Sequence, residues 1–315
     1  MAQYLPHVMQ NLFNQPLAIA PSTAHMIVSA LSGRLDIRAL EDMSMQMDER
    51  AMADLAAMGR MEVEARAAKP KAAAPVAQVV ETDYRPYRLT PSGIAILPVQ
   101  GSLVRTWGVG PFSGSTGYDG IWTQMLHAEE NPDVRAMWFD HNSGGGVVDG
   151  LWDLADAIYA TSARFGGKPK WGMAADFSAS ASYALLAACD VVHMPKLGQV
   201  GSIGCLVMHA DISRKLDKDG IDVTIVRAPE GKAKGNSVEP LDDETLADLY
   251  ETVSEHNDHF VERLTVYRPG LTKKAVSETN GKVYTGARAM ATGLVDDVLS
   301  EPAAWMKLEQ MIAQR

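Results

Sequence analysis

A run of three glycines in Asn142–Gly146 is the first segment suited to chemistry. Without a Cβ atom in the way, backbone amides there can turn toward a bound oxygen, which suits a phosphate or the oxyanion of a tetrahedral intermediate. No Gly-Lys-Ser/Thr follows, and the Gly-x-Gly-x-x-Gly spacing is absent, so the segment is neither a P-loop nor a dinucleotide fingerprint. A tight strand-to-helix turn explains the glycines equally well.

The second segment, Phe177–Ser182, carries serines at positions 178, 180 and 182. A serine at the start of a helix is most often only a cap. The functional alternative is a nucleophile whose Oγ stands at the carboxyl edge of a sheet. The small neighbours Ala179 and Ala181 would leave room for a peptide backbone.

A serine nucleophile needs a base, and the sequence offers two kinds. Among eight histidines, His209 is the best candidate, because it follows a predicted strand and the others show no convergence on the serines. A lysine can also serve if burial or a dipole keeps it neutral. Lys232 and Lys234 lie in a loop after a strand, where most lysines are solvated surface charges.

Strands and helices alternate from Tyr84 onward, in the order β-loop-helix. This pattern predicts an α/β domain with mostly parallel strands and right-handed crossovers. The predicted strands are 94–99, 134–139, 170–174, 191–194, 200–207 and 222–226, and the predicted helices include 118–130, 148–160, 212–219, 242–264 and 273–277, with another ending at Ala188.

We divide the chain into an N-terminal helical arm and linker (1–82), a main domain (83–300) and a C-terminal helical tail (301–315). Within the arm, a short helix is predicted at 22–31, a Met-rich helix at 39–68 and a linker at 69–78. The methionines fit an amphipathic packing face or an adaptable partner surface.

Composition excludes several classes of protein. The net charge is −10, which disfavours nucleic acid as a partner. Two cysteines, Cys189 and Cys205, rule out a disulfide scaffold and a four-cysteine zinc site, and they fit a reducing compartment. No apolar run approaches about 18 residues, so no membrane span is expected. The first residues lack the features of a signal peptide.

Seven segments in the right order resemble the signal peptide peptidase A family of serine peptidases, most closely its phage branch of head-maturation (minor capsid) proteases. The similar region is roughly 92–298, and its segments are 94–101, 115–134, 142–150, 179–183, 201–204, 232–241 and 283–296. The resemblance implies a Clp protease/crotonase-like α/β spiral of mostly parallel strands with flanking helices, here preceded by the helical arm.

The resemblance also implies a catalytic dyad of Ser180 and Lys232. Lys232, buried and neutral beside Ser180, would take the serine proton, and Ser202 would orient the lysine through its hydroxyl. Lys234 stays a minor alternative, because the matching segment holds two lysines.

Backbone amides of Gly145 or Gly146 and of Ala181 would form the oxyanion hole. Two departures from the family pattern lie here: Gly144 replaces a proline, and Ala181-Ser182 replaces two glycines after the nucleophile. These changes loosen the loop and narrow the site.

The expected activity is that of an ATP-independent serine endopeptidase, with no metal or cofactor. By resemblance, its substrates would be capsid, portal or scaffold proteins, and it would act as a homo-oligomer in the host bacterial cytoplasm, within the assembling procapsid, without nucleic-acid or membrane partners.

Three alternatives stay open at this point. The same fold could use a Clp-type triad of Ser180, His209 and an aspartate. The substitutions near Ser180 would also fit a catalytically inactive structural protein of the shell. A crotonase-like acyl-CoA enzyme would share the fold and the glycine segment without needing the Ser/Lys pair.

Overall fold

The computed structural model describes residues 16–20, 85–111 and 114–314. The helices predicted at 22–31 and 39–68 and the linker at 69–78 lie outside these residues. Residues 16–20, which we assigned to the arm, contain a strand of the main sheet.

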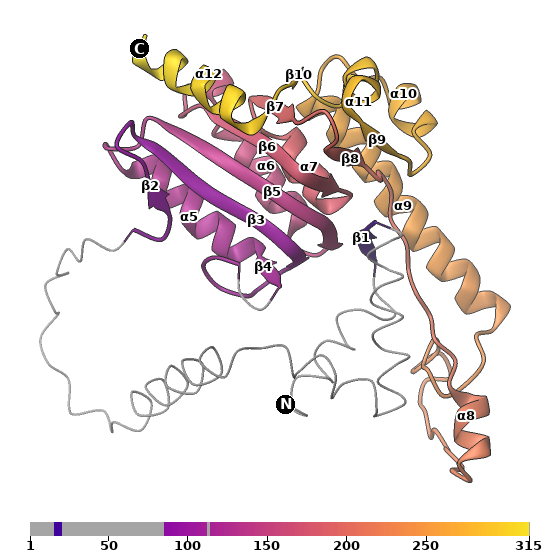
Figure 1. Ribbon diagram of the computed structural model, residues 1–315. Coiled ribbons are helices and arrows are strands. Elements are labelled where there is room, and N and C mark those ends of the chain that lie inside the picture. Colours follow the sequence, from indigo (N-terminus) through magenta and orange to yellow (C-terminus); the bar gives the residue numbers. More distant parts are fainter. Residues whose placement is uncertain (1–15, 21–84, 112–113, 315) are drawn as a thin grey trace, which may run out of the picture. The chain divides into compact units, whose positions relative to one another are not determined.

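A mostly parallel sheet forms the centre of the molecule (Figure 1). Its strands are β1 (Leu17–Ile19), β2 (Arg88–Leu89), β3 (Ile94–Val104), β4 (Ser115–Gly117), β5 (Ala136–Val147), β6 (Lys170–Ala179), β7 (Val191–Met194), β8 (Gln199–Gly201), β9 (Val283–Thr285) and β10 (Asp297–Val298). Strands β3, β5, β6 and β7 are parallel neighbours. Strands β1, β2 and β9 pair antiparallel with β5, β3 and β8. The predicted α/β class is confirmed.

Helices cover both faces of this sheet. They are α5 (Tyr118–Glu130), α6 (Leu151–Ala160), the short 3₁₀ helix η2 (Ala163–Phe165), α7 (Ala181–Ala187), α8 (Ser213–Lys218), α9 (Asp243–Tyr267), α10 (Lys273–Glu278), α11 (Gly286–Ala291) and α12 (Glu301–Ala313). Ala136 and Trp138 of β5 pack in one cluster with α12. Because side chains alternate along a strand, the buried Met137 and Phe139 face the other side, toward α5 and α7.

Two central strands are longer than the sequence pattern predicts. Strand β5 continues from the predicted 134–139 through all three glycines to Val147, so this segment is strand rather than loop. Strand β6 continues from the predicted 170–174 to Ala179. The reason is lateral pairing, because β5 has hydrogen-bonding neighbours on both sides at this end of the sheet.

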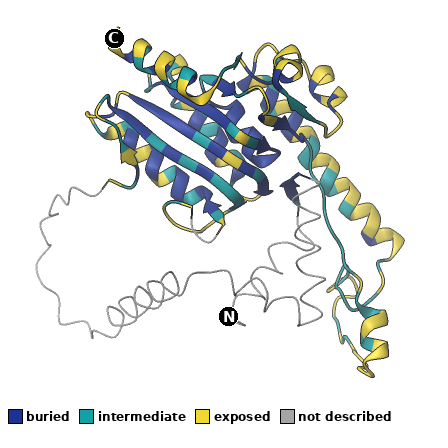
Figure 2. Ribbon diagram, viewed as in Figure 1, coloured by how far each residue is buried: buried dark blue, intermediate teal, exposed yellow. Residues whose placement is uncertain are grey.

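Residues 205–242, which we call the extension, leave the sheet after β8 and carry α8 away from it (Figure 1). Of the strand predicted at 200–207 only β8 forms, together with an isolated bridge between Leu206 and Leu17. No strand forms at 222–226, where the exposed Val226 has no sheet to join. Figure 2 shows the sheet as largely buried and the extension as exposed or half-buried.

A buried lysine fastens helix α5 to the sheet, and its removal is expected to destabilise the fold. Lys170 is fully buried, and its Nζ donates to Glu129 Oε2 at 2.8 Å and to the carbonyl oxygens of Thr161 and Lys168. Lys170→Ala leaves these acceptors without their donor, so we expect a loss of about 3–5 kcal/mol in the free energy of unfolding. Urea denaturation followed by circular dichroism measures it.

Lys215→Ala is the matched control, because Lys215 pairs with Asp219 at 2.7 Å on the exposed surface of α8. That change is expected to cost less than about 0.5 kcal/mol. Equal stability of the two variants would contradict the structural role of Lys170.

Candidate active site

Ser180 stands in a strained turn between β6 and α7. Its backbone has φ 55° and ψ −120°, a conformation that costs a non-glycine residue about 1–3 kcal/mol. The turn is held at both ends: the Ser180 amide donates to the Gly201 carbonyl at 2.8 Å, and the Ser180 carbonyl accepts from the Ala184 amide at 3.0 Å. A strained strand-to-helix turn is the geometry that presents a nucleophilic serine at the edge of an α/β sheet.

The glycines of β5 lie directly against this turn. A Cβ atom on Gly145 would stand 3.0 Å from the amide nitrogen of Ala181, the residue after Ser180. The Gly145 amide itself donates to Ser143 Oγ at 3.1 Å, so it is already engaged. Of the two predicted glycine donors, Gly146 is therefore the better placed to act with Ala181.

Strand β1 closes the site from outside. The same Cβ position on Gly145 lies 2.1 Å from the carbonyl oxygen of Ala18, so β1 passes over the glycine at backbone contact. Ser180 and Ala181 both have no exposed surface. The sequence analysis did not foresee this strand, because its pairing with β5 joins segments that are distant in the chain.

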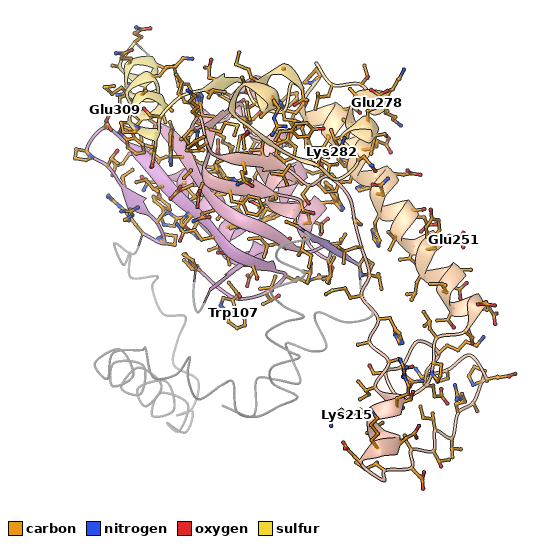
Figure 3. All side chains as sticks on the ribbon, turned by 45° about the vertical axis from the view of Figure 1, so that its right-hand side comes forward. Trp107, Lys215, Glu251, Glu278, Lys282 and Glu309 are labelled. Carbon is orange, nitrogen blue, oxygen red and sulfur yellow. The ribbon has the colours of Figure 1, made fainter. Side chains whose placement is uncertain are left out.

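The segment Gly201–Gly204 borders Ser180 on the other side. The Ser180 hydroxyl donates to the Gly204 carbonyl at 3.3 Å. Ser202 is buried with φ 52°, and its amide donates to the carbonyl of Lys282 at 2.8 Å. Lys282 marks this region in Figure 3. The structure thus brings the Ser202 segment to the nucleophile turn, as expected from the sequence.

Lys232, in contrast, is exposed on the extension between α8 and α9, whereas Ser180 is fully buried. Our expectation that Lys232 is buried beside Ser180 is wrong for the single chain. The physical reason is the missing strand at 222–226, which would have returned this part of the chain to the sheet.

The other proposed bases also lie on the extension. Lys234 binds Glu244 and lies 3.6 Å from Asp242. The hydrogen bond from Glu244, opposed in part by burial and supported by Asp242, raises the Lys234 pKa, which is the wrong direction for a general base. His209 is half-buried in the first part of the extension.

A histidine that the sequence analysis passed over converges on the serines. His141 Nδ1 lies 3.0 Å from Ser182 Oγ and 3.4 Å from Ser178 Oγ, and the two hydroxyl oxygens are 2.9 Å apart. All three side chains are fully buried. The statement that only His209 approaches the site is therefore wrong. The signal was available in principle, because His141 and Ser178 end neighbouring parallel strands.

This His141 network serves the turn rather than replacing Ser180 as the reactive centre. Ser178 and Ser182 flank Ser180, so their bonds to His141 fasten both sides of the strained turn. Burial lowers the pKa of His141 to about 3, so the ring is neutral at physiological pH.

Within the part of the chain that the structure describes, no group of three or more His, Cys, Asp or Glu side chains could hold a metal ion. No helix among the described residues is long and apolar enough to span a membrane.

Comparisons with known proteins point to one family. Residues 162–314 match the model of peptidase family S49. The chain is 32% identical over 305 residues to capsid assembly protease C of Escherichia phage lambda, covering 95% of this chain and 64% of that protein. It is also 32% identical over 301 residues to the head-tail preconnector protein GP5 of Enterobacteria phage P21, covering 95% of this chain and 56% of the relative. The chain thus spans less than two thirds of either relative. The resemblance inferred from the sequence is confirmed.

Solved structures with a related fold include the 1510-N membrane-bound stomatin-specific protease, at 12% identity and a TM-score of 0.45, covering 67% of this chain and 82% of that one. An enoyl-CoA hydratase/isomerase family member shares 16% identity at a TM-score of 0.42, with 73% and 75% covered.

His141 predicts a pH dependence of stability. Its pKa falls from 6.5 to about 3 on folding, so the unfolded chain binds the proton more readily. The free energy of unfolding should therefore fall as the pH drops from about 6.5 toward 3, by at most about 1.4 kcal/mol per pH unit from this group. Urea denaturation at a series of pH values measures the slope.

His141→Gln is the comparison, since it removes the titrating ring and keeps a polar side chain. The difference in unfolding free energy between wild type and this variant should shrink as the pH falls. A difference that is constant from pH 7 to 4 would contradict a buried neutral histidine.

Proposed function

The chain is related to peptidase family S49 through residues 162–314, and we propose that it is a serine endopeptidase with Ser180 as its nucleophile. The observation that carries this proposal is the strained turn of Ser180, set beside the glycines of β5. Strain of this kind is retained where the surrounding structure holds it, and it gathers at functional sites.

The proposed reaction uses backbone amides and one hydroxyl. Ser180 Oγ attacks the carbonyl carbon of an extended peptide, and the amides of Gly146 and Ala181 stabilise the oxyanion that develops. Gly145 contributes by leaving space, because a Cβ there would meet backbone atoms on both sides. Water then hydrolyses the acyl-enzyme and restores the serine.

We propose Lys232 as the base, supplied by a second copy of the chain. In one chain Lys232 is exposed, yet a lysine acts as a base only where water is largely excluded. The extension that carries it also exposes Ile221, Val223 and Val226, of which Val226 is 95% exposed. Apolar side chains of this kind favour burial against a partner, and a homo-oligomer would bring the extension of one copy to Ser180 of the next.

The proposed substrates are capsid, portal or scaffold proteins in an assembling phage head in the host cytoplasm. Support comes from the two phage relatives, named a capsid assembly protease and a head-tail preconnector protein.

A second candidate function is a catalytically inactive assembly protein on the same fold. The observation in its favour is the exposure of Lys232, which leaves Ser180 without a base inside one chain.

Labelling with a fluorophosphonate probe separates the two. The enzyme is expected to form a covalent adduct at Ser180 Oγ, located by peptide mapping, because the probe reports an activated serine. Ser180→Ala should lose the adduct and reduce casein cleavage by about 10⁴-fold or more. Ser178→Ala is the matched control and should keep the adduct. An adduct on Ser182 would instead assign the nucleophile to the pair with His141, and no adduct would favour the assembly protein.

Mixing two inactive variants tests whether the base comes from another copy. Ser180→Ala keeps Lys232, and Lys232→Ala keeps Ser180, so hybrid sites in a mixed oligomer hold both groups. We expect each variant alone to be inactive and the mixture to regain cleavage. The control mixes Ser180→Ala with the double variant Ser180→Ala/Lys232→Ala, which contains no nucleophile. A mixture as inactive as its components would refute the shared site.

A further inference from the structure

Strand β1 lies in the position of a peptide substrate. On one edge it pairs antiparallel with the glycine end of β5, with Ala18 opposite Gly146. On the other edge, Leu17 and Leu206 exchange two backbone hydrogen bonds of 2.8 and 2.9 Å. An extended peptide held by its backbone between two strand edges is a common mode of peptide recognition.

The register places one peptide bond of β1 at the proposed oxyanion donors. The Ala20 amide donates to the Gly144 carbonyl at 2.8 Å, and the Val148 amide donates to the Pro16 carbonyl at 3.4 Å. Bonded pairs alternate along an antiparallel ladder, so Ala18, midway between these residues, forms the bonded pair with Gly146.

The second oxyanion donor lies at the same place. The Ala18 carbonyl oxygen and the Ala181 amide nitrogen stand 2.1 and 3.0 Å from the Cβ position of Gly145, so that position lies between them. The carbonyl of Ala18 is therefore directed at the Gly146 and Ala181 amides, next to Ser180. Ile19, the following residue, pairs with Gly145 and supplies the nitrogen of this peptide bond.

The site accepts a small side chain at this position. Ala18 has no exposed surface, and Leu17, Ile19 and Ala20 are buried as well. A larger side chain in place of the Ala18 methyl would have to displace its neighbours in a close-packed interior.

We propose that the chain's own residues 16–20 are a substrate of this site, which cuts the bond between Ala18 and Ile19 and takes extended peptides with a small residue before the cut. This inference rests on the proposed peptidase function. Ser180 Oγ bonds to the Ala18 carbonyl carbon as the bond to the Ile19 nitrogen breaks, and the serine proton passes through the base to that nitrogen. Water then cleaves the ester, leaving a carboxylate on Ala18 and a free Ser180.

The consequence is a precursor whose site is filled by its own chain. Because β1 supplies the partner of both Gly146 and Leu206, its departure after cleavage exposes two strand edges to another extended peptide. Self-cleavage at Ala18 would therefore precede cleavage of other proteins.

The test is incubation of the purified full chain, followed by intact mass measurement and N-terminal sequencing. We expect a product that begins at Ile19 and increases with time, and no such product from Ser180→Ala. Ala18→Phe should slow this cut by about 10- to 200-fold, the range over which a tight pocket discriminates between side chains. Ala18→Gly is the matched control and should still be cut.

A synthetic peptide of residues 14–23 serves as a second substrate, independent of whether Ala18→Phe folds. Cleavage between its Ala18 and Ile19 by the wild-type chain is expected. If fluorophosphonate labels Ser180 and casein is cleaved while both bonds stay intact, self-cleavage is refuted and the peptidase function stands. If neither labelling nor any cleavage occurs, both proposals fall. A cut at another bond refutes the assignment of Ala18.

Discussion

Three backbone segments meet at Gly145, where there is room for no side chain. A Cβ atom there would stand 2.1 Å from the carbonyl oxygen of Ala18 and 3.0 Å from the amide nitrogen of Ala181, and the residue has φ 99°. Strand β5, the turn of Ser180 and strand β1 can approach each other only because this position is glycine. The placement of the Ala181 amide, the pairing of β1 and the complete burial of Ser180 all depend on that close approach.

The turn of Ser180 is the strained part of this arrangement, and the surrounding core stabilises it. Carbonyl and amide groups of Gly201 and Ala184 hold its two ends. Beneath it, His141 joins Ser178 and Ser182 in a fully buried network. Hydrogen bonds in such a low-dielectric interior are strong, and leaving one unmade is expensive, so the network keeps the turn in a single conformation. A histidine thus stabilises the serine site without contacting the reacting oxygen.

The two halves of the proposed catalytic apparatus differ in how they are held. The nucleophile and its amide donors belong to the buried sheet, whereas Lys232 lies on the exposed extension. The extension also carries Leu206, which pairs with the outer edge of β1. A movement or assembly step that repositions the extension therefore acts on the peptide groove and on the base together. This coupling gives a physical route from oligomer formation to activity, and it would keep a protease silent until its copies gather.

Local sequence determined the elements whose formation depends on neighbours in the chain. The helix at 118–130 and the strand at 191–194 form with the predicted bounds, and the small-residue run around Ser180 forms the predicted strand-to-helix turn. Tertiary structure alone decided that the glycines continue β5 as a strand, that His141 meets the serines, that residues 17–19 join the sheet and that Lys232 stays exposed. Each of these outcomes depends on which strand edge finds a partner, and strand pairing is a non-local interaction whose free energy is not encoded in the pattern of either segment alone.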